Sequence, residues 1–362
     1  MINTWAWIIW LGAVLVGLWS TRNPVYLGII FIGLILVWRL LTTAIEKVDP
    51  AERPRFPFSP RRISLIIIIF SAVFNGLISQ FGETVLFTLP AWIPYLGGPF
   101  TLEGLVFGAL NGLVLSGILI AFIVINLALP VHSLVRLIPR AFYPVAVVTS
   151  IAITFMPNTI QQFELIREAQ AIRGHRVRGI RDWIPLIMPL LIGGLEKAMG
   201  LAEAMTARGF AGQESSESNR NLRICQVVGL VLIFSGWLLQ SFSTRDTLGI
   251  AILMLGLGLV LFSLWKIGRR ASRSVYKREK WTGYDFLVIV FSLIVTVIYW
   301  LPLVNIDRST LFYNPYPFLT SPAINPSILF ATFGLIAPGI FYGFQGIPNK
   351  IFKKPASEND HF

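Results

Sequence analysis

The sequence predicts an all-α, polytopic membrane protein with about eight transmembrane helices, and three observations lead to this prediction. Of 362 residues, 55% are hydrophobic and only 13% are charged, at a mean hydropathy of +0.70, whereas a soluble domain carries roughly 25% charged residues. The apolar residues form long runs, and about 20 such residues cross a bilayer. The basic residues are concentrated in alternate connections between these runs. Together these features exclude a soluble globule.

Eight apolar runs are candidate membrane spans. They are Thr4–Ser20, Pro24–Leu41, Arg62–Phe81, Glu103–Leu129, Leu222–Phe242, Thr247–Lys266, Tyr284–Val304 and Pro326–Gly346. In the fourth run, small residues recur every four positions at Gly104, Gly108, Gly112 and Ser116. Small residues at this spacing let helices approach closely in lipid, so we expect the fourth span to pack tightly against a neighbour.

The distribution of positive charge predicts the orientation. Of the 30 Lys and Arg residues, 27 lie in the connections 39–62, 136–223 and 266–280 or in the tail after 349, and the opposite side keeps Arg22, Arg245 and Arg308. Because cytoplasmic connections carry the excess of basic residues, we expect both termini to be cytoplasmic. The excess of basic residues on the cytoplasmic side of the lipid bilayer also explains the formal charge of +12, so no nucleic acid is expected as a partner. No cleavable signal peptide is recognised at the N-terminus, and the single Cys225 cannot form an internal disulfide.

Several function classes are disfavoured by what the sequence lacks. No ionisable residue lies deep within a predicted span, although ion-driven carriers need such groups near the midplane; Glu103 and Asp285 sit at span edges. His132, His175 and His361 are too scattered for a metal site, so no metal or cofactor is expected. No catalytic constellation and no Gly-x-x-x-x-Gly-Lys-Ser/Thr loop occurs. We therefore expect a non-catalytic subunit without an ATPase of its own.

Between the fourth and fifth spans, Pro130–Asn221 has a helical pattern but is expected to be too charged for lipid. It contains three helix-like pieces: a short one around His132–Arg140, a second over about Ala141–Arg173 with Pro157 as a candidate break, and a third over about Trp183–Arg208 with Pro185 and Pro189 near its start. The last turns of the second piece place Leu165, Ala169 and Ile172 on one stripe, as in a one-faced helix.

The second and third pieces end in the same pattern, Glu-Ala-x-x-x-Arg-Gly, 35 residues apart. The matching residues are Glu168, Ala169, Arg173 and Gly174 in the second piece, and Glu203, Ala204, Ala207, Arg208 and Gly209 in the third. Glycine just past a helix end adopts the left-handed conformation that closes the last turn, and a cation suits the carbonyl end of the helix dipole. A guanidinium fits an acidic groove on a partner protein. Phosphate would also fit, but no glycine-rich cradle accompanies these arginines.

These motifs carry a resemblance to a known family. Residues Thr84–Gly209 resemble the T subunit of energy-coupling-factor (ECF) importers, the EcfT/CbiQ-type membrane proteins. The second helix matches the family's Ala-Gln-x-x-Arg-Gly ending through Ala169, Gln170, Arg173 and Gly174. The third matches Glu-Ala-Met-x-Ala-Arg-Gly-Phe through Glu203, Ala204, Met205, Ala207, Arg208, Gly209 and Phe210. Ile172 replaces the usual alanine before the first arginine, and we therefore expect a looser fit of that helix to a partner, with the arginine retained.

The resemblance implies a division of labour. Two ABC-type ATPase subunits each receive one coupling helix, with Arg173 and Arg208 as docking residues. A small membrane protein captures the substrate, a vitamin or a transition-metal ion, and this chain transmits the ATPase movements to it in a bacterial plasma membrane or organellar inner membrane. The expected organisation is membrane helices in 1–129, coupling helices in 130–221, a fifth membrane helix in 222–246, and a C-terminal extension with three further spans in 247–362, for which the resemblance offers no function.

Two other readings stay open at this point. The eight spans and the unexplained extension suit a stand-alone secondary transporter or membrane enzyme. Ile172 suits a membrane scaffold that has kept the coupling fold but no longer transports. Uptake without ATPases would support the former, and a pull-down without ATPases or a capture protein would support the latter.

Overall fold

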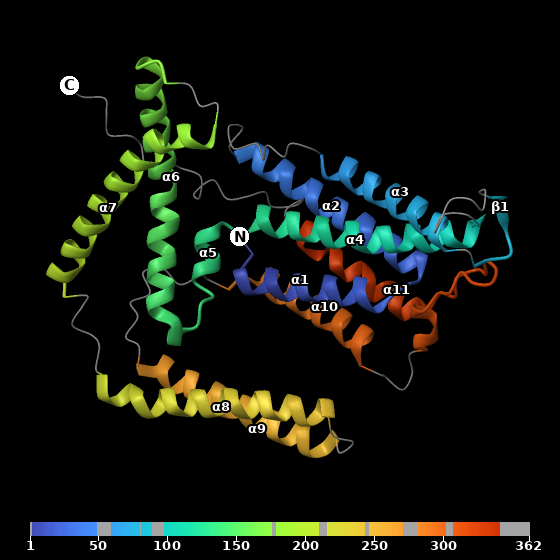
Figure 1. Cartoon of the computed structure of the whole chain (residues 1–362). Helices are drawn as coiled ribbons and strands as arrows, with labels where there is room; N and C mark the ends of the chain where they lie inside the picture. Colours follow the sequence, from blue (N-terminus) through green and yellow to red (C-terminus); the bar gives the residue numbers. More distant parts are fainter. Residues whose placement is uncertain are drawn as a thin grey trace. The chain divides into compact units, whose positions relative to one another are not determined.

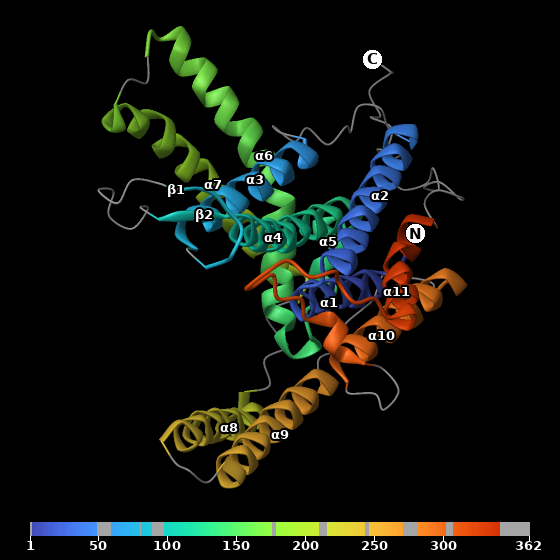
Figure 2. The same cartoon turned by 90° about the vertical axis from the view of Figure 1, so that its right-hand side faces the viewer.

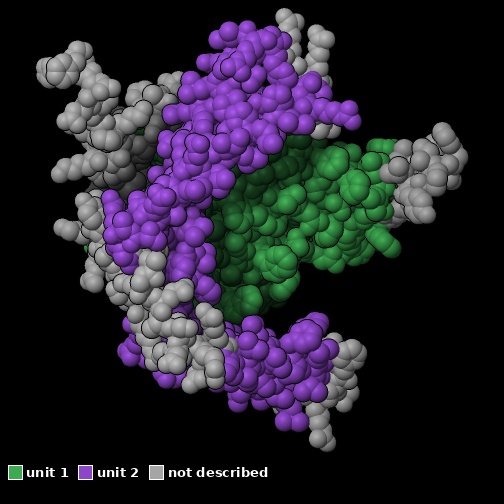
Figure 3. Space-filling model, turned by 60° about the vertical axis from the view of Figure 1, so that its left-hand side comes forward, with its two compact units in different colours: residues 1–130, 277–362 green, residues 131–276 purple. Residues whose placement is uncertain are grey.

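The computed structural model describes residues 2–48, 59–79, 81–88, 98–175, 179–209, 216–242, 246–270, 281–301 and 307–340. These residues are mostly helical, with one pair of short strands (Figures 1 and 2). Contacts divide the chain into two compact units, residues 1–130 with 277–362 and residues 131–276 (Figure 3). The prediction of an all-α polytopic membrane protein is confirmed.

The first unit contains α1 (Thr4–Ser20), α2 (Pro24–Val48), α3 (Pro60–Ile78), α4 (Leu102–Ala128), α10 (Gly283–Trp300) and α11 (Pro326–Phe333), with the antiparallel strands β1 (Val85–Thr88) and β2 (Pro99–Thr101). Polar side chains begin several of these helices. The Asn3 Oδ1 accepts from the Trp5 amide, and the Thr101 Oγ1 accepts from the Gly104 amide. Such caps satisfy backbone donors that have no partner inside the helix.

The second unit contains α5 (Val131–Val135), α6 (Tyr143–Ile172), α7 (Ile184–Ala207), α8 (Ser216–Phe242) and α9 (Asp246–Arg270), with 3₁₀ turns at Arg140–Phe142 and Ile180–Trp183. Pro157 lies inside α6 without ending it, and Pro189 lies inside α7. Pro144 and Pro185 occupy the first turns of α6 and α7, where the missing amide proton costs nothing.

Among the described residues, seven helices are long and apolar enough to cross a membrane. Five correspond to predicted spans: α2, α3, α4, α9 and α10. The first, fifth and eighth predicted spans are shorter apolar helices, at Thr4–Ser20, Ile224–Gln240 and Pro326–Ile340. The other two long helices are α6 and α7. We expected the whole of 130–221 to be too charged for lipid, and by amino-acid composition this was wrong for α6 and α7. Their charged residues lie in the second half of each helix, and the first halves are apolar.

The small-residue row of α4 packs against α3, as predicted. A Cβ built at Gly108 would lie 2.8 Å from the Ala72 Cα, and one at Gly112 would lie 2.8 Å from the Ile68 Cα. The Ser71 Oγ also donates to the Gly108 carbonyl at 2.8 Å. The two backbones approach so closely that only glycine fits at these positions.

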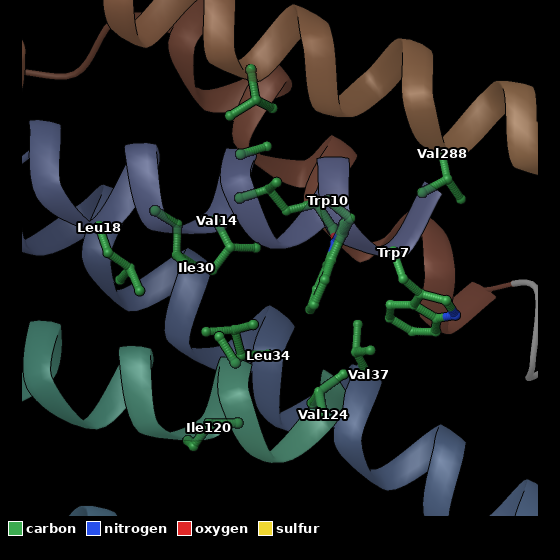
Figure 4. Close-up of a cluster of buried hydrophobic side chains, with 14 of the residues drawn as sticks. Trp7, Trp10, Val14, Leu18, Ile30, Leu34, Val37, Ile120, Val124 and Val288 are labelled. Carbon is green, nitrogen blue, oxygen red and sulfur yellow. The ribbon is translucent and has the colours of Figure 1, made fainter. Parts of the chain in front are cut away.

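A cluster of buried apolar side chains forms the core of the first unit (Figure 4). It joins four helices: Trp7, Trp10, Val14 and Leu18 from α1, Ile30, Leu34 and Val37 from α2, Ile120 and Val124 from α4, and Val288 from α10. The Trp7 and Trp10 rings meet edge to face, with centroids 5.3 Å apart. The Trp10 Nε1 donates to the Leu335 carbonyl at 2.8 Å, so the buried indole is also satisfied.

The C-terminal part of the chain completes this bundle. The Asn3 amide donates to Asp285 Oδ1 at 2.7 Å, and the Thr282 amide donates to Asp285 Oδ2 at 2.7 Å. The Leu311 carbonyl accepts from the Thr21 Oγ1 at 3.0 Å. Residues predicted as one extension, 247–362, thus divide between the units: α9 packs on α8, whereas α10 and α11 pack on α1 and α2.

In the second unit, α8 and α9 form an antiparallel pair that lies side by side in both views (Figures 1 and 2). A Cβ at Gly236 would lie 3.0 Å from the Gly249 carbonyl, and a Cβ at Gly229 would lie 3.1 Å from the Gly256 carbonyl. The buried Ser263 Oγ donates to the Leu222 carbonyl at 3.1 Å. The contacts therefore recur every seven residues, at positions 222, 229 and 236 of α8 and, in reverse order, at 263, 256 and 249 of α9. We call the five small residues among these positions, Gly229, Gly236, Gly249, Gly256 and Ser263, the small-residue seam.

Candidate functional site

The end of α6 has the geometry that the sequence predicts for a glycine-terminated helix. Arg173 is the last residue of helical character, and Gly174 follows at φ +80°. The Gly174 amide donates to the Ala171 carbonyl at 2.9 Å, and the His175 amide donates to the Gln170 carbonyl at 3.0 Å. These two bonds define a Schellman motif, which closes the helix and satisfies its last carbonyls.

The end of α7 repeats this geometry. Arg208 occupies the same position as Arg173, and Gly209 follows at φ +77°. The Gly209 amide donates to the Thr206 carbonyl at 2.9 Å, the counterpart of the Gly174 bond. Phe210, which belongs to the predicted second motif, lies outside the described residues. The two helix ends therefore agree in backbone conformation as well as in sequence, and we call them the α6 tip (Glu168–Gly174) and the α7 tip (Glu203–Gly209).

The predicted docking residues are all exposed. They are Glu168, Ala169, Arg173 and Gly174 on the α6 tip, and Glu203, Ala204, Ala207, Arg208 and Gly209 on the α7 tip. Ile172, which departs from the resemblance, is 88% exposed. Within the described part of the chain, the guanidinium groups of Arg173 and Arg208 make no hydrogen bond or ion pair with another residue. Each tip thus presents an exposed guanidinium group, whose N–H donors are free to bind a partner, next to small side chains.

A contact between α6 and α7 lies well behind the tips. The Lys197 Nζ donates to Gln162 Oε1 at 2.8 Å, and the Gln162 side chain lies against Gly193, where a Cβ would clash with it. The Phe163 and Trp183 rings stack nearby, with centroids 6.4 Å apart. Gln162 and Lys197 each lie eleven residues before the arginine of their own helix, about 16 Å along each helix axis. Gln162 and Lys197 are therefore 35 residues apart in the sequence, as are Arg173 and Arg208.

Both helices also carry exposed apolar side chains over most of their length. On α6 these include Val145, Val148, Met156, Ile160 and Leu165, and on α7 they include Ile187, Met188, Leu191, Ile192, Leu195 and Met199. The predicted stripe of Leu165, Ala169 and Ile172 is among the exposed residues. These helices therefore leave apolar surface available for lipid or for another membrane protein.

Sequence reasoning identified both tips but missed the contact behind them. Gln162 and Lys197 are ordinary polar residues that no motif marks. Aligning the two pieces at the 35-residue offset would have placed them at equivalent positions, and that was the one available signal. Among the described residues no contact between the two tips is recorded, so the candidate site consists of two separate helix ends.

The fold defines the class of protein: an integral, multi-pass, all-α membrane protein with two exposed helix ends of matching sequence. Comparison with known families makes this specific. The profile of the CbiQ family, described as cobalt transport protein, matches residues 2–219, which is more than half of the chain. The chain belongs to the CbiQ family, and the resemblance inferred from its motifs is confirmed.

Curated relatives bear the same family relationship. The chain is 34% identical over 131 residues to the energy-coupling factor transporter transmembrane protein EcfT of Exiguobacterium sibiricum, covering 34% of this chain and 41% of that protein. It is 26% identical over 218 residues to EcfT of Ruminiclostridium cellulolyticum, covering 55% of this chain and 79% of that protein. It is 33% identical over 106 residues to EcfT of Bacillus subtilis, covering 27% of this chain and 35% of that protein.

The match therefore extends over less than half of the Exiguobacterium protein. The names of these relatives identify transmembrane components of a transporter. No solved structure matches the chain.

Proposed function

We propose that this chain is the coupling subunit of an ATP-driven ECF-type importer. In this role, α6 and α7 act as coupling helices: each tip docks into one of two ABC-type ATPase subunits, and the chain transmits ATPase opening and closing to a small membrane protein that captures the substrate. The observation that carries the proposal is the agreement of the two tips in sequence, in backbone conformation and in exposure.

The chemistry of the tips supports docking to protein. A guanidinium presents five donors in a rigid fork that matches a carboxylate. Its position just before Gly174 or Gly209 holds it at the carbonyl end of the helix, where a positive charge is favoured. Alanine at positions 169, 204 and 207 leaves room for a groove wall to approach closely. ATP hydrolysis is then the task of the partners, and this chain takes no catalytic part.

The proposal includes an orientation. With 27 of 30 basic residues in alternate connections, both termini and both tips face the cytoplasm, where ATPase subunits can reach them. The exposed apolar sides of α6 and α7 suit a cytoplasmic interfacial position beneath a membrane partner. A bacterial plasma membrane is the setting that the named relatives favour, with an organellar inner membrane as the alternative.

The substrate follows from the partner and not from this chain. The family description names cobalt, and we propose a transition-metal ion or a vitamin as the cargo, selected by the capture protein. The described residues of this chain contain no cluster of three or more His, Cys, Asp or Glu side chains that could hold a metal ion.

Charge reversal tests the docking role. The double variant Arg173→Glu/Arg208→Glu, expressed with the ATPase subunits, should reach the membrane in wild-type amount but lose ATPase co-purification, because each tip would then present a carboxylate to an acidic groove. Arg167→Glu is the matched control: Arg167 is an exposed arginine of α6 outside both tips. Retention of both ATPases by the double variant would contradict the proposal.

A further inference from the structure

The C-terminal end of α9 carries an arrangement that the coupling role does not use. The Arg269 guanidinium lies over the Trp265 ring, 4.0 Å from its centroid, and the Lys266 Nζ lies 5.3 Å from the centroid of the Phe262 ring. All four side chains are exposed. We call them the α9 patch. They lie beyond residue 219, where the family match ends.

The α9 patch occupies one face of the helix. At 100° per residue, Phe262, Trp265, Lys266 and Arg269 fall within an arc of about 100°, and the same arc contains the exposed Leu255 and Gly258 one to two turns earlier. The α9 residues of the small-residue seam, Gly249, Gly256 and Ser263, contact α8 and are centred about 130° away from the patch. The patch therefore faces away from α8, toward the surroundings of the hairpin.

The depth of the patch can be estimated from the seam. Gly236 of α8 lies opposite Gly249 of α9, so Trp237, which contacts Phe234, lies near the start of α9. From that level to Trp265 is about 25 Å along the helix, close to the roughly 30 Å thickness of a bilayer hydrocarbon core. Tryptophan is enriched at both membrane–water interfaces. The Phe234–Trp237 pair and the Phe262–Trp265 pair thus have about the separation of two interfacial belts, and the α9 patch lies at the second of them.

The two cations of the α9 patch contact aromatic rings and no anionic side chain among the described residues. Ring contacts restrict Lys266 and Arg269 without using up their hydrogen-bond donors, and within the described ranges neither forms an ion pair. Beneath them on the same face, a Cβ at Gly258 would meet nothing within 4 Å, and Leu255 is 59% exposed. The two basic side chains thus adjoin an exposed apolar surface, with free space at Gly258. This combination fits a molecule with an anionic head and a long apolar chain.

We propose that the α9 patch binds an anionic phospholipid, with Lys266 and Arg269 contacting the headgroup phosphate and with Phe262, Gly258 and Leu255 contacting an acyl chain. The proposal is independent of the coupling role, since no residue of either tip takes part. On the orientation inferred from charge, the lipid belongs to the cytoplasmic leaflet, where anionic headgroups attract basic residues beside a membrane helix.

The test uses the full chain purified in mild detergent and native mass spectrometry with added phosphatidylglycerol or phosphatidylcholine. Wild type should retain phosphatidylglycerol in preference to phosphatidylcholine. Lys266→Gln/Arg269→Gln should weaken phosphatidylglycerol binding on the order of 20-fold, since each basic residue near the headgroups contributes about a factor of five. Trp265→Leu keeps both charges but should weaken binding severalfold, because Arg269 loses its stacking surface.

The matched control is Arg39→Gln/Arg62→Gln, which removes the same charge at two exposed arginines for which the structure records no ring contact. Its phosphatidylglycerol binding should stay within about twofold of wild type, because neither arginine belongs to the α9 patch. Equal loss in both double variants, or equal retention of the two lipids, would overturn the proposal. Millimolar inorganic phosphate should not displace the lipid. Complete displacement by phosphate would mean a free-anion site and would also overturn it.

Discussion

The Lys197 ammonium donates to the Gln162 amide oxygen at 2.8 Å, joining α7 to α6 at residues that precede their own arginines by the same number of positions. Because both helices are continuous from this contact to their tips, the distance from contact to arginine is equal on the two sides. A given rotation of either helix about this point would therefore displace the tip of that helix by a similar amount.

Breaking this contact should affect coupling more than assembly. In Gln162→Leu, Lys197 loses its acceptor while a side chain of similar length still fills the space against Gly193. We expect both ATPases to co-purify at wild-type level, whereas substrate taken up per ATP hydrolysed in proteoliposomes should fall severalfold. Gln161→Leu, at an exposed neighbouring position, is the control. Unchanged coupling in Gln162→Leu would remove this contact from the mechanism.

The tip glycines should resist substitution for a backbone reason. Alanine at Gly174 or Gly209 must adopt positive φ, at a cost of about 1 kcal/mol each, so the last helical turn should fray and ATPase affinity should fall. Gly194→Ala is the comparison, because Gly194 lies inside α7 with open space around it, and alanine there should stabilise the helix. Isothermal titration with the purified ATPase subunits would measure the difference. Equal affinity for all three variants would argue against a role for the tip conformation.

The row of small residues in α4 should be sensitive to side-chain size. Gly108→Leu would place a side chain against the α3 backbone at Ala72, and overpacking of this kind costs roughly 1–3 kcal/mol or more. We expect a lower thermal unfolding midpoint in detergent and a lower yield. Gly12→Leu and Gly28→Leu lie where a Cβ meets nothing within 4 Å and should unfold near the wild-type temperature. If all three variants behaved alike, the close α3–α4 packing would be contradicted.

The register of the α8–α9 hairpin can be checked by disulfide crosslinking. In a Cys225→Ser background, Gly236→Cys/Gly249→Cys should crosslink on mild oxidation, since a Cβ at position 236 lies 3.0 Å from the Gly249 carbonyl and bridged residues need closely spaced Cα atoms. Gly236→Cys/Gly258→Cys pairs positions that the seam keeps apart and should stay reduced. The electrophoretic shift of the oxidised hairpin after cleavage in the 243–245 connection reports the result. The opposite pattern would place the two helices in another register.

Much of this architecture could be predicted from the sequence, and the exceptions have physical causes. Apolar runs predicted the membrane helices, and the glycines of α4 predicted close packing, because local composition determines both. The helix ends at Gly174 and Gly209 were predictable because a single residue type dominates that conformation. The apolar first halves of α6 and α7 were missed because charge was assessed over the whole of 130–221, whose charged residues are concentrated near the tips. The pairing of Asn3 with Asp285, 282 residues apart, left no local signal at all.

That last contact bears on how the protein is made. The buried face of α1, including Trp7 and Trp10, packs on α10 and on Leu335, yet α1 leaves the ribosome long before either is synthesised. At roughly 5–20 residues per second, the first helix spends on the order of 15–60 s in the membrane without its final neighbour. We therefore expect the early helices either to associate provisionally or to be shielded by an insertase until translation is complete. A chain truncated before residue 281 should be removed by quality-control proteases.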